Sequence, residues 1–167
     1  PASRMMGVSI DITERKMIEE RILISEARLA AAVDAAALGF YEMGGDLRVR
    51  FYDDRMRAFL GITPADEEHG REFWLAHIHP DDLPRIANQS RQVLAEGVDR
   101  FAGEYRYLHP ERGLTWLQHI SRVLERNTSG RAMRVVGVMQ DITERRLEEE
   151  TLLASKAALR DSQKDLR

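Results

Sequence analysis

The two ends of the chain carry copies of one sequence motif, and this repeat constrains the fold more than any other feature. GVSIDITERKMIEERILISEARL begins at Gly7, and GVMQDITERRLEEETLLASKAAL begins at Gly137. In each copy, β-forming residues lead into Asp-Ile-Thr-Glu, and a charged segment with helical periodicity follows. Asp11 and Asp141 are predicted N-caps, and the glutamate three residues later completes a capping box. The repeat therefore predicts a strand and then a helix at each end.

Apolar residues in both terminal helices follow the alternating spacing of four and three residues that is typical of a coiled coil. Serines occupy several positions of this seam, so we expect weak pairing that shifts easily between arrangements. The alternative is a solvated helix whose leucines contact their own domain. The predicted dimer seam consists of Ile18, Ile22, Leu29, Leu152 and Leu159.

Between the terminal helices the apolar pattern changes to the period of two that is typical of β-strands. Gly44, Gly45 and Asp46 predict a hairpin turn between the first two strands. Asp53 or Asp54 is expected to cap a short helix that ends at Gly61, and a longer helix is expected from Pro80 to near Gly97. A further helical stretch is expected around residues 73–78. The expected strands span residues 40–43, 47–51, 101–108, 115–124 and 133–140.

The composition excludes several classes of function. The chain has 167 residues, of which 43% are hydrophobic and 32% charged, and its formal net charge is −3. This charge gives no basic field for nucleic acid, and no apolar run is long enough to cross a membrane. Without cysteine there is no thiolate metal site, no cysteine nucleophile and no cysteinyl adduct to a chromophore. We expect a cytoplasmic module whose parent protein is anchored in a membrane elsewhere, if at all.

Three motifs in the middle of the chain resemble those of the PAS domain with its C-terminal PAC motif. Leu38-Gly39-Phe40-Tyr41 is similar to the first strand of that family, and His77-Ile78-His79-Pro80-Asp81-Asp82 to its hxHPDD motif. The segment from Tyr105 through Gly113 to Trp116 is similar to its YR…G…W hairpin. The resemblance implies an α+β fold, in which a five-stranded antiparallel sheet carries helices on one face and connector helices flank the core.

The resemblance and the alternation of side chains along strands together predict a cavity above the inner face of the sheet. A small organic ligand among tyrosines, a histidine and adaptable methionines is one interpretation, and a filled core is the other. Trp116, Gln118 and Ile120 are expected on the outer face, where a connector helix could cover them. The candidate ligand-binding residues are Tyr41, Met43, Met56, Tyr105, Tyr107, Leu117, His119 and Met139.

Other cofactors and catalytic sites find little support in the sequence. His77, His79 and Asp81 superficially resemble a metal-hydrolase signature, but they are better explained as the start of a helix, so no metal site is predicted. In the flavin-binding light-oxygen-voltage branch of the family, a glutamine usually occupies the position that matches Met139. That branch also has a reactive cysteine in a helix, and this chain has no cysteine. Heme would need His77 or His119 as its ligand. We expect neither heme nor flavin, no catalytic residue, and either no cofactor or an unknown small molecule.

The resemblance implies a domain order and a function. Residues 1–10 would be the last strand of a preceding PAS domain, 11–37 a connector helix, 38–140 the PAS core, and 141–167 a coiled-coil connector. The expected function is a bacterial sensory and relay module that passes a change through Asp141, Thr143 and Glu144 to an effector. That effector is expected to be a histidine kinase of a two-component system, with a diguanylate cyclase as the next candidate. The alternatives are a ligand-free spacer and dimerisation domain within a tandem array, or a heme-binding PAS sensor. The expected partners are a second copy and neighbouring domains of the same chain, without nucleic acid or direct membrane contact.

Overall fold

The computed structural model describes residues 11–165, including the side chains of residues 11–160. The chain divides into two units, with the boundary between Ala37 and Leu38. The first unit contains helix α1 (Thr13–Ala35), which has no buried residue. The predicted strand at residues 7–10, and its interpretation as the remnant of a preceding domain, lie outside the described residues.

The second unit contains a five-stranded sheet, as the resemblance predicted. Its strands are β1 (Gly39–Gly44), β2 (Val49–Tyr52), β3 (Arg100–His109), β4 (Gly113–Arg126) and β5 (Ala132–Asp141). Their order is β2-β1-β5-β4-β3, and every neighbouring pair is antiparallel. The last strand therefore lies at the centre of the sheet, where it contacts both the first hairpin and the long β3–β4 hairpin.

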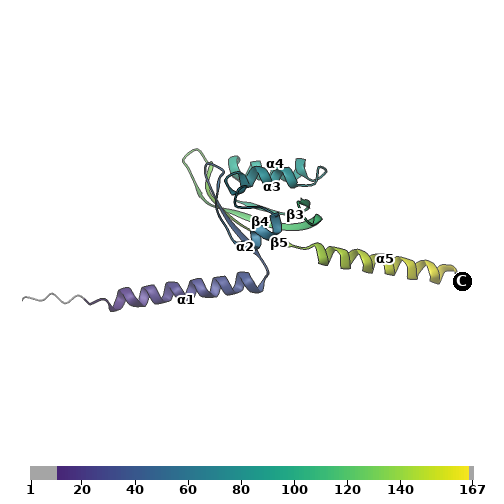
Figure 1. Cartoon of the computed structure of the whole chain (residues 1–167), viewed down its shortest axis with the longest axis horizontal. Helices are drawn as coiled ribbons and strands as arrows, with labels where there is room; N and C mark the ends of the chain where they lie inside the picture. Colours follow the sequence, from purple (N-terminus) through teal and green to yellow (C-terminus); the bar gives the residue numbers. More distant parts are fainter. Residues whose placement is uncertain (1–10, 166–167) are drawn as a thin grey trace, which may run out of the picture. The chain divides into compact units, whose positions relative to one another are not determined.

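The helices between β2 and β3 cover one face of this sheet. They are α2 (Asp54–Leu60), a short 3-10 helix (Glu67–His69), α3 (Gly70–His77) and α4 (Leu83–Ala95). Figure 1 shows α3 and α4 on the same side of the strands. Residues of β1, β3, β4 and β5 alternate between buried and more exposed, as period-two patterning requires. Tyr105, Tyr107 and Leu117 are fully buried at the centre of the resulting core.

Helix α2 follows the local rules that its sequence indicated. The Asp53 carboxylate accepts a hydrogen bond of 2.7 Å from the backbone N–H of Met56, and it is the N-cap of the helix. Gly61 ends the helix in the left-handed conformation, with φ of 66°, which glycine adopts without steric strain. Met56 and Leu60 face the core, where they have almost no exposed surface.

Helix α4 begins three residues later than predicted, at Leu83 rather than Pro80. Asp82 precedes it but makes no capping hydrogen bond. Its carboxylate instead accepts hydrogen bonds from the backbone N–H of Arg106 at 2.9 Å and from the guanidinium of the same residue at 3.0 and 3.1 Å. The bidentate pair with Arg106 joins two charged groups, whereas a cap would join the carboxylate to a neutral backbone N–H, and here the pair fastens the start of α4 to β3. The guanidinium of Arg106 holds the pKa of Asp82 below its usual range.

Helix α5 (Thr143–Asp165) follows β5 after a single residue, Ile142, which is buried. Both terminal helices begin one residue later than the capping-box prediction required. The carboxylates of Asp11 and Asp141 still accept the backbone N–H of Thr13 and Thr143, at 2.9 and 3.0 Å. Within residues 11–165, none of the helices combines the length and apolar character that crossing a membrane requires.

Candidate functional site

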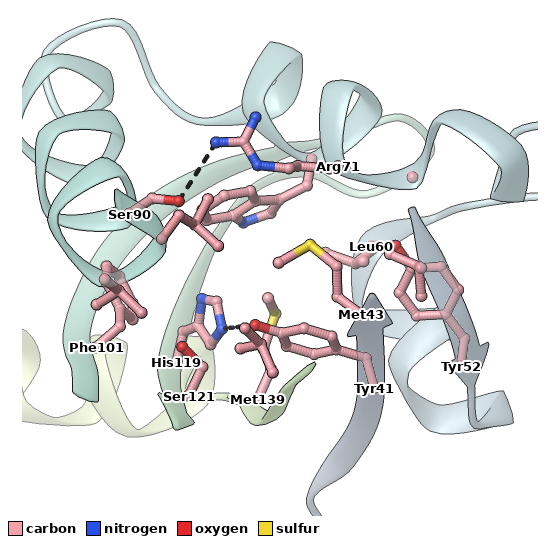
Figure 2. A pocket seen from close by; sticks show the side chains of 16 residues that line it. Tyr41, Met43, Tyr52, Leu60, Arg71, Ser90, Phe101, His119, Ser121 and Met139 are labelled. Atoms are coloured by element: carbon pink, nitrogen blue, oxygen red, sulfur yellow. Dashed lines mark hydrogen bonds between the residues drawn. The ribbon is translucent and has the colours of Figure 1, made fainter. Parts of the chain in front are cut away.

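A cavity of about 50 Å³ lies between the sheet and the helices. It is lined by side chains from all five strands and from α2, α3 and α4 (Figure 2). Most of the lining is apolar, with Met43, Leu60 and Phe101 among its members. The lining residues are Tyr41, Met43, Val49, Tyr52, Leu60, Gly70, Arg71, Trp74, Ser90, Val93, Leu94, Phe101, His119, Ser121, Val135 and Met139.

A hydrogen-bonded network forms the polar part of the cavity. The Tyr41 hydroxyl lies 3.0 Å from Nε2 of His119, and the Tyr105 hydroxyl lies 3.3 Å from Nδ1 of the same ring. The indole N–H of Trp74 donates to the Tyr105 hydroxyl at 2.8 Å, and that hydroxyl lies 3.9 Å from the sulfur of Met139. Because a neutral imidazole has one donor and one acceptor, the two tyrosines must play opposite roles toward His119. The network thus joins α3 to β1, β3, β4 and β5.

Burial sets the protonation states in this network. The pKa of His119 falls to about 3 because burial disfavours the imidazolium form. The pKa of Tyr41 rises to about 12, again mainly by burial, and that of Tyr105 rises well above its ordinary value. At neutral pH the three groups are therefore uncharged, and they interact as neutral hydrogen-bonding partners.

The structure brings together half of the predicted ligand-binding residues. Tyr41, Met43, His119 and Met139 line the cavity, whereas Met56, Tyr105, Tyr107 and Leu117 are fully buried without lining it. The hydroxyl of Tyr107 donates to the carbonyl of Leu60 at 2.9 Å, so it fastens β3 to α2. A role in ligand binding stays a prediction for all eight.

Sequence reasoning missed six polar or aromatic members of the cavity lining. These are Tyr52 of β2, Arg71 and Trp74 of α3, Ser90 of α4, Phe101 of β3 and Ser121 of β4. Alternation along β4 places Ser121 on the same face as His119, so this signal was present in the sequence. The positions of Arg71 and Ser90 depend on how two helices cross the sheet, and short-range patterning does not contain that information.

Gly137 explains how Tyr41 reaches His119. The two residues are opposite each other in the β1–β5 register, and a Cβ atom at Gly137 would lie 2.3 Å from the Tyr41 ring. Only glycine lets the ring lie this close to the backbone of β5. The glycine that opens the repeated motif thus makes room for a side chain of the cavity.

The junction between β5 and α5 is held by a second set of contacts. Oδ1 of Asp141 lies 2.5 Å from the Thr143 hydroxyl, and Oδ2 accepts a hydrogen bond of 2.7 Å from Arg112. Thr143 in turn accepts the backbone N–H of Trp116 at 2.9 Å. Burial works to raise the pKa of Asp141, but the bonds from Thr143 and Arg112 outweigh it and hold that pKa below its usual value.

The first turn of α5 is also fastened to the outer face of the sheet. Glu104 of β3 forms ion pairs with Arg145 and Arg146. The Arg146 guanidinium also lies 4.6 Å from the centre of the Trp116 ring, within the range of a cation–π interaction. The prediction that a connector helix could cover Trp116 agrees with this contact. Glu144, by contrast, is exposed, and its proposed role in coupling stays a prediction.

The cavity of this structure is smaller than a heme or a flavin, the two large cofactors that the sequence analysis weighed. A porphyrin or the three-ring system of a flavin is far larger than a cavity of about 50 Å³. Nδ1 of His77 lies 2.8 Å from the carbonyl of Phe73, and both ring nitrogens of His119 have tyrosine partners. Across residues 11–165, no cluster of three or more histidine, cysteine or acidic side chains is placed to hold a metal ion.

The PAS fold family matches residues 49–139, which is more than half of the chain. The chain belongs to this family, whose members are sensory modules rather than catalytic domains. Comparison with solved structures agrees. A sensory box histidine kinase/response regulator from Burkholderia thailandensis superimposes with a TM-score of 0.61 at 26% identity, over 80% of this chain and 98% of the other.

Two relatives come from signalling proteins. The two-component sensor PprA of Pseudomonas aeruginosa is 29% identical over 93% of this chain, and a methyl sulfide methyltransferase-associated sensor of Methanosarcina acetivorans is 33% identical over 60%. The chain spans only 17% and 10% of the lengths of these two proteins. A light-oxygen-voltage domain shares the fold, with a TM-score of 0.55 at 14% identity. The chain is therefore a PAS sensor domain of the kind found in two-component sensors.

Proposed function

We propose that this domain relays a change at the cavity into helix α5, and that α5 passes it to an effector. One observation carries the proposal: His119 and Met139 are opposite each other in the β4–β5 register, and Leu117 is opposite Asp141. A residue of the polar network thus lies two positions along the same strand from the carboxylate that holds α5. A shift of β5 relative to β4 would change both places together.

The contacts at the junction support this route. Thr143 and Ile142 bond the backbone N–H and carbonyl of Trp116, each at 2.9 Å. Trp116 stands beside Leu117 on the strand that carries His119. The coupling that such a relay needs is small, because about 1 to 3 kcal/mol biases two helix arrangements substantially.

The proposed partners are a second copy of the chain and an effector domain further along a longer protein. The predicted seam residues are all exposed, with exposed fractions of 51% for Ile18, 52% for Ile22 and 54% for Leu152. Met17, Leu23 and Ile24 are exposed as well, so α1 presents apolar side chains beyond the predicted seam. The likeness to a two-component sensor and to a sensory box histidine kinase favours a histidine kinase as the effector.

Cysteine cross-linking tests the relay cleanly, because the chain has no cysteine of its own. Single cysteines along α5 form disulfides between two copies where the helices face each other. We expect Leu152→Cys and Leu159→Cys to cross-link faster than Leu153→Cys, the matched control one position from the seam. His119→Phe should change this pattern, and Asp141→Ala should abolish the change.

Two results would count against the proposal. Equal cross-linking at all three positions would show that the α5 helices of two copies do not pair along the predicted seam. If His119→Phe changes the cross-linking pattern equally with and without Asp141→Ala, the junction at Asp141 does not carry the change to α5.

The size of the cavity favours a second candidate, a relay that takes its input from a neighbouring domain without any ligand. A cavity of about 50 Å³ is small beside the roughly 300 to 1,000 Å³ of most ligand pockets. In that case no small molecule would alter the cross-linking pattern, whereas His119→Phe still would.

A further inference from the structure

Arg71 is unusual among the partly buried arginines of this domain. Arg57, Arg106, Arg126 and Arg146 each bind a carboxylate in a salt bridge. Arg71 lines the cavity, yet among residues 11–160 it forms no salt bridge with an acidic side chain, and its guanidinium has only a hydrogen bond of 3.4 Å to Ser90. A guanidinium that is partly removed from water without a carboxylate partner is unfavourable.

The cavity around Arg71 also lacks the negative charge that the other four arginines have beside them. None of the residues that line the cavity is acidic. Burial lowers the pKa of Arg71, and the charge of its chain neighbour Glu72 offsets this only in part. The pKa values of Arg57 and Arg106, by contrast, are raised by hydrogen bonds to their carboxylates. An anion at Arg71 would supply the interaction that the other arginines obtain from the protein.

The rest of the cavity limits what this anion is. Arg71 and Ser90 lie at one side, and Tyr41, His119 and Ser121 lie across from them (Figure 2). Apolar side chains such as Met43, Leu60 and Met139 also line the cavity. A cavity of about 150 Å³ accommodates benzene, so about 50 Å³ suits only a few non-hydrogen atoms. The apolar lining disfavours strongly hydrated anions such as phosphate and favours an anion with a carbon body.

We propose that the cavity binds a small monocarboxylate of two or three carbons, with its carboxylate on Arg71 and Ser90 and its methyl end toward Met43 and Met139. The planar guanidinium matches a carboxylate with two parallel hydrogen bonds. This inference rests on the proposed function, because it names the ligand class of the same cavity from which the relay starts.

Trp74 provides a direct reporter of occupancy. Its indole N–H belongs to the polar network and its side chain lines the cavity, whereas Trp116, the second tryptophan, lies on the outer face beside Arg146. In a proton–nitrogen NMR spectrum each indole gives one signal, and Trp116→Phe assigns them. The signal of Trp116 serves as the internal control.

The experiment titrates the whole chain with sodium acetate, and in parallel with acetamide, a neutral molecule of the same shape, at equal ionic strength. We expect acetate to shift the Trp74 signal with a dissociation constant on the order of millimolar, since so few atoms make contact. Acetamide should bind at least about tenfold more weakly, as the loss of a charge-assisted bond implies. Arg71→Gln should weaken acetate binding by a similar factor, while Arg131→Gln, which removes the same charge from an exposed turn, should not.

Three results would overturn the inference: an unshifted Trp74 signal at about 50 mM acetate, well above the expected range, equal binding of acetate and acetamide, or unchanged acetate binding in Arg71→Gln. The relay is judged separately by cross-linking of α5. If acetate does not bind but α5 still responds to His119→Phe, the ligand class is wrong and the relay is supported. If acetate binds but α5 does not respond, the site is supported and the relay is wrong.

Discussion

The cavity and the junction with α5 use opposite kinds of interaction. The network of Tyr41, Tyr105 and His119 at the cavity is neutral and buried, with His119 only 4% exposed. The junction is built from charged groups at the surface, such as Arg112, whose side chain is 45% exposed. Buried neutral networks are strong and specific, whereas exposed ion pairs contribute little to stability and rearrange easily. The comparison indicates a stiff input region connected to an output that can change without unfolding the domain.

Acid should have the largest effect on stability, and it should act on the buried network at the cavity. Because the pKa of His119 is about 3 when folded and about 6.5 when unfolded, the unfolded chain binds the proton first as the pH falls. Stability should therefore decrease below pH 6.5, by about 2 to 3 kcal/mol at pH 4.5, as measured by urea denaturation. His119→Gln should remove most of this slope, and His69→Asn, at an exposed histidine, should leave it in place. An equal slope in the His119 variant would contradict the assignment.

Tyr105→Phe should produce the next largest effect. It leaves the indole N–H of Trp74 without its acceptor in a buried place, which costs about 2 kcal/mol. Denaturation gives the loss, and the NMR signal of the Trp74 indole should shift. Tyr107→Phe is the matched control, since its hydroxyl bonds the carbonyl of Leu60 and not a member of the network around His119. It should destabilise the domain similarly while the Trp74 signal stays in place.

Asp141→Asn should affect the output more than the stability. The amide keeps an acceptor for the Thr143 N–H but loses the charge that binds Arg112, so the expected loss is about 1 kcal/mol or less. Hydrogen exchange in the first turn of α5 should accelerate more than this loss of global stability explains. Glu42→Gln removes a comparable ion pair with Arg134 between β1 and β5, and it should leave α5 unchanged. Equally accelerated hydrogen exchange in both variants would show that Asp141 has no special role in holding α5.

Salt should have the smallest effect and should separate the two regions most clearly. Raising sodium chloride to about 1 M shortens the screening length to about 3 Å, which weakens the pairs of Glu104 with Arg145 and Arg146. We expect faster exchange in the first turn of α5, a change in global stability below about 0.5 kcal/mol, and an unchanged Trp74 signal. A large shift of the Trp74 signal would show that the cavity depends on the surface charges.

The sequence predicted the regular elements well, because these depend on local patterns. Alternation placed Tyr105, Leu117 and His119 on the inner face, and Asp53 and Gly61 marked the ends of α2. The boundary of α4 was wrong for a physical reason. Pro80, Asp81 and Asp82 satisfy the local rules for a helix start, but a bidentate bond to Arg106, which is distant in the sequence, occupies Asp82 instead.

The candidate site was harder to predict, because it is formed by contacts between distant elements. Tyr107 and Met56 face inward, as alternation and helical periodicity indicate, yet neither is among the residues that line the cavity. Arg71 reads as an ordinary surface residue at the start of a short helix. Only the packing of α3 beside α4 brings it near Ser90 and opposite His119. The ion pairs of Glu104 with Arg145 and Arg146 likewise depend on where α5 leaves the sheet.

Hydrogen exchange at the backbone amides of residues 143–147 tests the relay most directly. Two variants of equal global stability are compared, His119→Gln in the network and a conservative substitution at Ile86, which is fully buried in α4. The relay predicts that His119→Gln accelerates exchange in the first turn of α5 beyond its effect on global stability, and that the Ile86 variant does not. Identical exchange in the two variants would show that the cavity and the output helix are not coupled through β4 and β5.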